Sequence, residues 1–206
     1  MKNLITNITQ SLEYLVERIP WVYRFFDNYY ENIIDNEIDL AGIKKEDRIL
    51  CIGGGPCPST AIQLHMKTGA RVCVIDNDEE VVESAIRNVK RFNLCEFVSV
   101  ELADGTNISA EDFSVVHIAL QVSPKTRVFE KVVNTSLPGT KVLVRVAKDN
   151  FSKLYSPFKD DFISSDGIVY HRKKNLDYTL MHVTRGGANE EVLASANSFI
   201  FDCVST

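Results

Sequence analysis

The sequence predicts an open α/β sheet of seven strands that are mostly parallel, with an antiparallel hairpin at one edge. Short apolar runs alternate with helical patterns along most of the chain, as expected for repeated strand–helix units. Three glycines, Gly53 to Gly55, directly follow the first apolar run and precede a helical pattern. The chain has 206 residues, of which 45% are hydrophobic, and this is enough for one ordinary globular core.

Apolar residues at helical spacing predict two helices ahead of the sheet, over residues 3–19 and 21–37. Pro20 separates them, because a proline inside a helix removes a hydrogen bond and clashes with the preceding turn. We expect residues 1–40 to form a helical cap, followed by the sheet-containing domain over residues 41–206.

The parallel part of the sheet is predicted from apolar runs that alternate with amphipathic segments. Its strands cover residues 48–53, 71–76, 96–102, 114–120 and 140–147, and its helices cover residues 59–67, 77–92 and 125–137. Ser59 or Thr60 is expected to cap the first of these helices at its start, and Gly69 suits its C-terminal cap. Two further strands, near residues 167–172 and 177–185, are predicted to form the edge hairpin, and the tail is expected to hold a short helix and a last strand.

The glycine turn predicts a nucleotide-binding corner. A strand, a glycine loop and a helix in this order form such a corner in open α/β sheets, although a tight turn can also be purely structural. Gly53, Gly54 and Gly55 allow the chain to turn sharply and a ligand to approach without a Cβ in the way. Asp76 ends the second strand and Asn77 follows it, at a place where an acidic group can accept hydrogen bonds from both hydroxyls of a ribose.

The loop chemistry favours S-adenosylmethionine (SAM) over a dinucleotide. A dinucleotide needs several backbone N–H groups around its pyrophosphate, but Pro56 and Pro58 have none to donate. SAM has no phosphate, so a loop that contains proline is compatible with it. Asp104 and Gly105 follow the third strand, where a carboxylate can meet an adenine amino group.

Together, Gly53, Gly55, Asp76 and Asp104 resemble the binding motifs of class I SAM-dependent methyltransferases. This resemblance implies a Rossmann-like methyltransferase fold with SAM as the cofactor. The chain departs from the motif in its first strand, where Cys51 stands in place of the usual acidic residue.

A closer resemblance is to the nicotianamine synthases, a branch of this fold. That family has an Asn-Tyr-rich helix that ends in a glutamate, a Gly-x-Gly-Pro loop with a second proline, and an arginine in its fifth strand. The matching residues are Tyr30, Glu37, Gly53, Gly55, Pro56, Pro58, Arg145, Ala147, Leu154 and Tyr155. Lys148 replaces the family's histidine, Ser156 replaces its proline, and the chain is short for the family.

The resemblance suggests roles for the polar residues around the cofactor. An amine nucleophile must lose a proton, and Glu37 is the first candidate for the base, with Tyr30 to orient it. The alternative is that Glu37 is a solvated residue at a helix end. Arg145 lies near the carboxyl end of the fifth strand, where it can bind a substrate carboxylate, and Tyr155 is expected to line the same cleft.

Three functions remain open on these residues. The resemblance implies transfer of the aminocarboxypropyl group of SAM to the amine of a small molecule or amino acid. The short N-terminal region favours an ordinary small-molecule methyltransferase instead. Cys51 and Cys57, which replace motif residues, also allow a SAM-binding protein without catalytic activity.

Composition narrows the range of partners and locations. The net charge of −5 comes without a basic stripe, so we expect no nucleic-acid partner. We expect no signal peptide, because the N-terminus lacks a compact apolar core. We expect no membrane span, because no apolar run approaches about 20 residues. The five cysteines form no C-x-x-C pair and are read as reduced thiols of a cytoplasmic protein. Scattered histidines argue against a metal site, and the hairpin and tail offer a surface for a homodimer.

Overall fold

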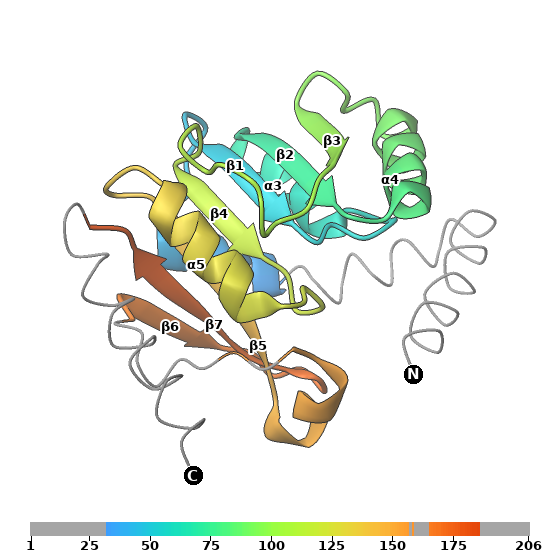
Figure 1. The fold of residues 1–206 in the computed structure, drawn as a ribbon. Helices are drawn as coiled ribbons and strands as arrows, with labels where there is room; N and C mark the ends of the chain where they lie inside the picture. The colour runs from blue at the N-terminus through green and yellow to red at the C-terminus, as the bar shows by residue number, and fades with distance from the viewer. Residues whose placement is uncertain (1–31, 157, 159–164, 186–206) are drawn as a thin grey trace, which may run out of the picture.

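A computed structural model describes residues 32–156, 158 and 165–185 of the chain (Figure 1). The helix expected over residues 3–19, the start of the second one with Tyr30, and the tail from residue 186 lie outside the described residues. Of the predicted N-terminal cap, the structure therefore describes only its last part, which is helical over residues 32–41.

The centre of the protein is a seven-stranded sheet in the order β3-β2-β1-β4-β5-β7-β6. Its strands are β1 (Arg48–Ile52), β2 (Arg71–Asp76), β3 (Val98–Leu102), β4 (Val115–Ile118), β5 (Lys141–Ala147), β6 (Gly167–Tyr170) and β7 (Leu176–Val183). Strands β1 to β5 pair in parallel, whereas β7 runs antiparallel to both β5 and β6. The predicted fold class, a mostly parallel sheet with an antiparallel edge hairpin, is confirmed.

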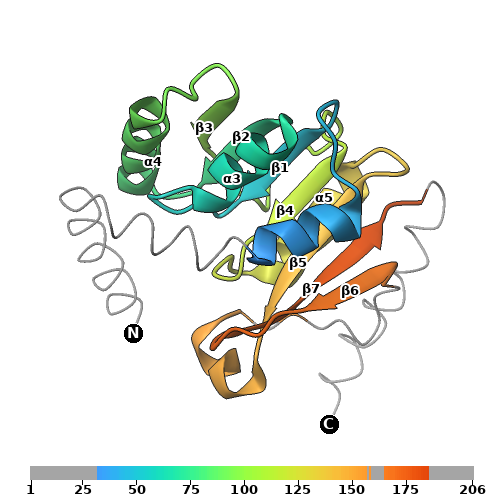
Figure 2. The ribbon, with the colours of Figure 1, turned by 180° about the vertical axis from the view of Figure 1, so that it is seen from behind.

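Helices cover both faces of this sheet. The segment over residues 32–41, α3 (Ser59–Thr68) and α4 (Glu79–Arg91) pack on one face, and α5 (Lys125–Thr135) packs on the other (Figures 1 and 2). A short 3-10 helix, η1 (Asp149–Leu154), follows β5. No helix of the described part of the chain is both long enough and apolar enough to cross a membrane.

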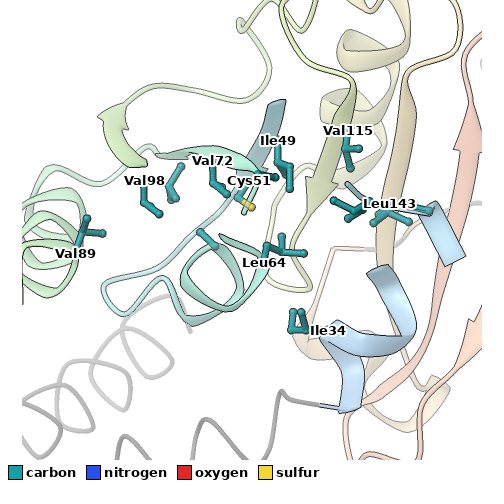
Figure 3. Packing of buried hydrophobic residues seen from close by; sticks show 14 residues of the cluster. Ile34, Ile49, Cys51, Leu64, Val72, Val89, Val98, Val115 and Leu143 are labelled. Carbon is teal, nitrogen blue, oxygen red and sulfur yellow. The ribbon is translucent and has the colours of Figure 1, made fainter. Parts of the chain in front are cut away.

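The two layers of core follow from alternation along the strands. In β1, Ile49 and Cys51 point into one buried cluster, and Leu50 and Ile52 point into the other. Figure 3 shows the first cluster, in which Ile34 of the 32–41 segment packs with residues of α3, α4 and the strands. The short apolar run that predicted the strand is therefore explained by burial on both faces.

The helix ends agree with the prediction at one position and differ at another. Gly69 ends α3 in the left-handed conformation, with φ 77°, as its position after the helix predicted. The predicted cap by Ser59 or Thr60 is wrong, because Pro58 occupies the N-cap position and no side chain caps the helix. The Thr60 hydroxyl instead accepts a hydrogen bond from Arg145, at 3.1 Å.

The topology brings the candidate residues to one edge of the sheet. The carboxyl ends of the parallel strands β1 to β5 meet there, and ligands of open α/β sheets bind at this edge. Because β7 runs in the opposite direction, its first residue, Leu176, pairs with Ala147 at the end of β5. The turn between β6 and β7 therefore reaches the same edge.

Candidate active site

The glycine loop is close-packed against the sheet. A Cβ on Gly53 would lie 2.6 Å from Val122 Cγ2, and a Cβ on Gly54 would lie 2.1 Å from Val74 Cγ1. Gly55 has φ 66°, which side-chain-bearing residues rarely adopt, and a Cβ there would have its nearest neighbour at 3.8 Å. The first two glycines thus allow tight packing, and the third leaves the loop's outer side open.

Asp76 connects the glycine loop to the end of β2. Its Oδ2 accepts a hydrogen bond from the Gly55 N–H at 3.0 Å, and its Oδ1 accepts a long one of 3.4 Å from Asp78 N. Partial burial raises the pKa of Asp76, while the backbone N–H donors lower it. Oδ1 retains acceptor capacity for a ligand hydroxyl, and the next residue, Asn77, is exposed.

Asp104 and Gly105 lie beside Asp76, after β3. The Asp104 Oδ1 accepts hydrogen bonds from the backbone N–H and the hydroxyl of Thr106, both at 2.8 Å, and these bonds lower the pKa of Asp104. Gly105 is buried, and a Cβ there would lie 2.8 Å from Ile52 Cγ2. The glycine therefore permits the loop after β3 to pack over the end of β1, with the Asp104 carboxylate exposed.

Pro56 fixes the glycine loop to helix α4. It is buried, and its carbonyl accepts a hydrogen bond of 2.9 Å from the Asn88 side chain in α4. The loop, Asp76 and Asp104 together fit an adenosine that carries no phosphate: they offer a backbone without Cβ atoms and carboxylate oxygens for hydroxyl and amino donors. These residues would hold the nucleoside part of SAM.

Glu37 and Arg145 form a buried ion pair at the same end of the sheet. The Arg145 guanidinium donates from Nε to Glu37 Oε1 and from Nη2 to Oε2, both at 2.8 Å. Glu37 has no exposed surface and Arg145 is 4% exposed. A bidentate pair of this geometry fixes both side chains, and it joins the 32–41 segment to β5.

The pair keeps the Glu37 carboxyl ionised. Burial alone would raise the pKa of Glu37, but the facing charge of Arg145 and the imidazole of His117 hold it well below its ordinary value. The alternative that Glu37 is a solvated helix-end residue is excluded by its complete burial.

Three further polar side chains surround Glu37. The Thr179 hydroxyl in β7 donates to Glu37 Oε1 at 2.7 Å, and it also bonds to His171 Nε2 at 2.8 Å. His117 in β4 places its Nε2 3.5 Å from Glu37 Oε2, beyond a good hydrogen bond. Burial lowers the pKa of His117, so this imidazole is neutral at pH 7.

The two predicted substrate-binding residues occupy different surroundings. All three guanidinium nitrogens of Arg145 donate to Glu37 or Thr60, so a substrate carboxylate would have to compete with these bonds. Tyr155 is half-buried, and its hydroxyl accepts a hydrogen bond of 3.2 Å from the Asn175 side chain. Its ring packs beside the apolar cluster formed by Ile33, Leu120 and Leu176. The roles predicted for both residues stay predictions.

Lys125 is a buried charge that the sequence analysis did not single out. It begins α5, is 1% exposed, and donates from Nζ to the carbonyls of Leu120 at 2.9 Å and Arg145 at 2.8 Å. Burial lowers its pKa to about 8. Among the described residues, no carboxylate forms an ion pair with it.

The cysteines and acidic residues make no other site in the described part of the chain. No disulfide joins Cys51, Cys57, Cys73 and Cys95 to one another. No group of three or more His, Cys, Asp or Glu side chains in these residues could hold a metal ion.

The comparisons with known proteins place this chain in a family. The family model described as protein-L-isoaspartate(D-aspartate) O-methyltransferase (PCMT) matches residues 32–168, and the chain belongs to this family. It is thereby a member of the class I SAM-dependent methyltransferase superfamily, with SAM as the cofactor, as predicted.

Individual proteins similar to this chain carry more specific names than the family model does. The chain is 30% identical over 127 residues to an L-histidine 2-aminobutanoyltransferase of Pseudomonas aeruginosa, a match that covers 59% of this chain and 46% of that protein. A crystal structure of the nicotianamine synthase MtNAS in complex with MTA and tNA matches with a TM-score of 0.72 and 27% identity, over 80% of this chain and 64% of that one. The predicted resemblance to nicotianamine synthases is confirmed.

A further structure supports the fold. A glutamate-to-glutamine mutant of MtNAS in complex with S-adenosylmethionine matches with a TM-score of 0.75 and 24% identity, over 89% of this chain and 74% of that one. The chain spans about half the length of the curated relative, 46% of it.

Proposed function

We propose that the protein transfers the aminocarboxypropyl group of SAM to the amine of a small amino acid. The observation that carries this proposal is the buried Glu37–Arg145 pair at the carboxyl edge of the sheet. Arg145 also donates to Thr60 at the start of α3, the helix that follows the glycine loop, so the pair lies close to this loop. Similarity to a 2-aminobutanoyltransferase and to a nicotianamine synthase supports the same group transfer.

One group of site residues would bind the nucleoside, and Glu37 would act on the acceptor amine. Gly53 to Gly55, Asp76 and Asp104 would hold the adenosine. SAM, when bound, supplies an electrophilic carbon attached to its sulfonium. Glu37 contributes a fixed negative charge, which stabilises the positive charge that develops on the attacking amine nitrogen. Because the Glu37 pKa is low, this carboxylate suits charge stabilisation better than it suits holding a proton.

Methyl transfer to a small molecule is the second candidate function. The family model that matches residues 32–168 is named for an O-methyltransferase, and the nucleoside site serves either reaction. The two reactions differ in which carbon of SAM faces the acceptor. Both candidates predict a small-molecule acceptor; a cytoplasmic location and a homodimer remain separate predictions.

Isotopic labels separate the two reactions. The protein is incubated with L-histidine and with SAM labelled either in the methyl carbon or in the carbons of the aminocarboxypropyl group. Aminocarboxypropyl transfer predicts that only the second label appears in the acceptor, and methyl label in the acceptor would contradict it. As a control for binding, we expect Glu37→Gln to keep its SAM affinity while its transfer slows.

A further inference from the structure

The hydrogen bonds around Thr179 define the protonation of His171. Glu37 is ionised and can only accept, so the Thr179 hydroxyl donates its single proton to Glu37 Oε1, at 2.7 Å. The same hydroxyl oxygen lies 2.8 Å from His171 Nε2. Since the hydroxyl proton is already used, Nε2 must be the donor, and the neutral imidazole carries its proton there.

This tautomer leaves the other ring nitrogen as an acceptor. The Nδ1 atom of His171 is buried and has no hydrogen-bond partner among the described residues. A buried acceptor without a partner destabilises the folded state, because it has lost its bonds to water and gained none. His171 is only 5% exposed, so bulk water does not readily donate a hydrogen bond to Nδ1 in place of the missing partner. The Nδ1 lone pair therefore suits a donor that enters the site.

His171 lies at the edge of the sheet where the carboxyl ends of the parallel strands meet. It follows β6 in the turn that reaches the carboxyl edge of β5, and its backbone N–H donates to Asp177 O at 2.7 Å. The same turn carries Asn175, which bonds to Tyr155. The imidazole is thus held by its ring and by its backbone at the edge where open α/β sheets bind their ligands.

We propose that His171 is a catalytic residue of the transfer, whose Nδ1 accepts an N–H of the acceptor amine, while Thr179 and Glu37 position it. The inference rests on the proposed function. As the amine nitrogen forms its bond to the aminocarboxypropyl carbon, the carbon–sulfur bond breaks and its electron pair leaves with methylthioadenosine. The amine proton moves to Nδ1, which makes the ring an imidazolium. The Nε2 N–H of this imidazolium still donates its hydrogen bond to the Thr179 hydroxyl. The ring then releases the new proton to water.

The charges that face His171 are compatible with this role. Burial lowers the pKa of His171, the charges of Arg145 and Lys173 lower it further, and Glu37 raises it. The ring is therefore neutral at pH 7, as a base must be. When it takes a proton, the Glu37 charge behind Thr179 offsets the new positive charge, as a carboxylate does for histidine in hydrolase triads.

The tautomer can be measured without turnover. In a protein with ¹⁵N-labelled histidine, long-range proton–nitrogen spectra report which ring nitrogen of each of the four histidines is protonated, and His171→Gln assigns the signal. We expect a neutral His171 with its proton on Nε2, and a shift of Nδ1 when L-histidine is added together with methylthioadenosine, which is not a sulfonium and transfers no group. A proton on Nδ1 in the free protein overturns the proposal, and so does an Nδ1 signal that the additions leave unchanged.

Two variants then separate proton transfer from positioning. His171→Gln keeps an amide N–H for Thr179 but has no Nδ1, so we expect kcat to fall about 10²-fold or more with little change in KM. Thr179→Val removes the link to Glu37, and we expect a smaller loss together with a changed His171 signal, which Thr179→Ser restores. His182→Gln is the matched control: His182 is also a buried histidine, but it faces Asp166 and Phe129, and we expect it to keep activity.

The outcomes distinguish this inference from the function on which it rests. If the wild-type protein transfers the aminocarboxypropyl group and His171→Gln is as fast, only the role of His171 is overturned. If the wild-type protein releases S-adenosylhomocysteine instead, the proposed function fails and the role of His171 as base for the amine fails with it.

Discussion

Glu37 remains charged although none of its surface reaches solvent. Its charge is stable because two N–H groups of Arg145 and the hydroxyl of Thr179 point at its oxygens. Each partner lies more than 100 positions away in the sequence. The site therefore exists only when the 32–41 segment has packed on β5 and β7.

Removal of this charge should cost stability as well as activity. Glu37→Gln leaves the Arg145 guanidinium buried without its counter-charge, and we expect the free energy of unfolding to fall by about 3–5 kcal/mol. Urea unfolding measures this loss. Asp35→Asn is the control on the same segment, because Asp35 pairs with Lys67 at 2.8 Å on the surface and should lose less than about 1 kcal/mol. Equal losses of unfolding free energy in the two variants would contradict the claim that the buried ion pair stabilises the protein more than the surface pair does.

The residues of the site were predictable to different degrees. Glu37 and Arg145 were found because the nicotianamine synthases, which the chain resembles, share a glutamate at the end of this helix and an arginine in the fifth strand. Thr179 could not be found in this way, since threonine is common in strands and its partner in space is set by the antiparallel pairing of β7 with β5. His171 lies in a turn, where a histidine carries no special signal.

At the scale of elements, Lys125 joins the ends of two strands. Its ammonium donates to Leu120 O, just after β4, and to Arg145 O in β5. These bonds hold together the two strand ends that carry His117 and the ion pair. The Lys125 side chain is buried, and this burial lowers its pKa to about 8.

This lysine should give the protein an unusual dependence on alkaline pH. Its ordinary pKa of 10.5 applies to the unfolded chain, so between about pH 8 and 10.5 the unfolded state binds more protons than the folded state. The contribution of Lys125 to the free energy of unfolding should therefore rise with pH in this window. Lys125→Met should flatten the rise in denaturant titrations. An unchanged slope in the variant would show that another group is responsible.

The glycine loop depends on close packing against β2. Gly54→Ala would place a Cβ 2.1 Å from Val74 Cγ1, and we expect a loss of about 1–3 kcal/mol in the free energy of unfolding. Gly55→Ala has room but a left-handed backbone, so it should cost about 1 kcal/mol through strain. The test for contact is the double variant Gly54→Ala/Val74→Ala, whose loss should be smaller than the sum of the single losses. Additive losses would argue against the contact.

The elements themselves were largely predictable from the sequence. Strands buried on both faces read as short apolar runs, as in β1, and glycines or prolines mark their ends. The helix cap at Ser59 or Thr60 was mispredicted because the helix already includes both residues, with Pro58 at the N-cap position, and Thr60 bonds to Arg145 instead. The exact order of the strands likewise follows from packing over the whole sheet.

For the whole molecule, the fold alone does not decide the reaction. The sheet order and the nucleoside site are compatible with transfer of either carbon group, and the family match is named for a methyltransferase. The polar cluster behind the sheet edge, where Glu37, Thr179 and His171 are joined by hydrogen bonds, fits an amine acceptor in either reaction, and the carbon of SAM that faces this acceptor decides between the two. A buried carboxylate and a neutral imidazole suit an amine that must lose a proton while positive charge develops on its nitrogen.

The most direct test of this account is to identify the nucleoside that the purified protein releases from SAM in the presence of L-histidine. Chromatography against standards separates the two possible products. Aminocarboxypropyl transfer predicts methylthioadenosine, formed together with an adduct of the acceptor. S-Adenosylhomocysteine as the released nucleoside would contradict aminocarboxypropyl transfer and would establish methyl transfer in its place.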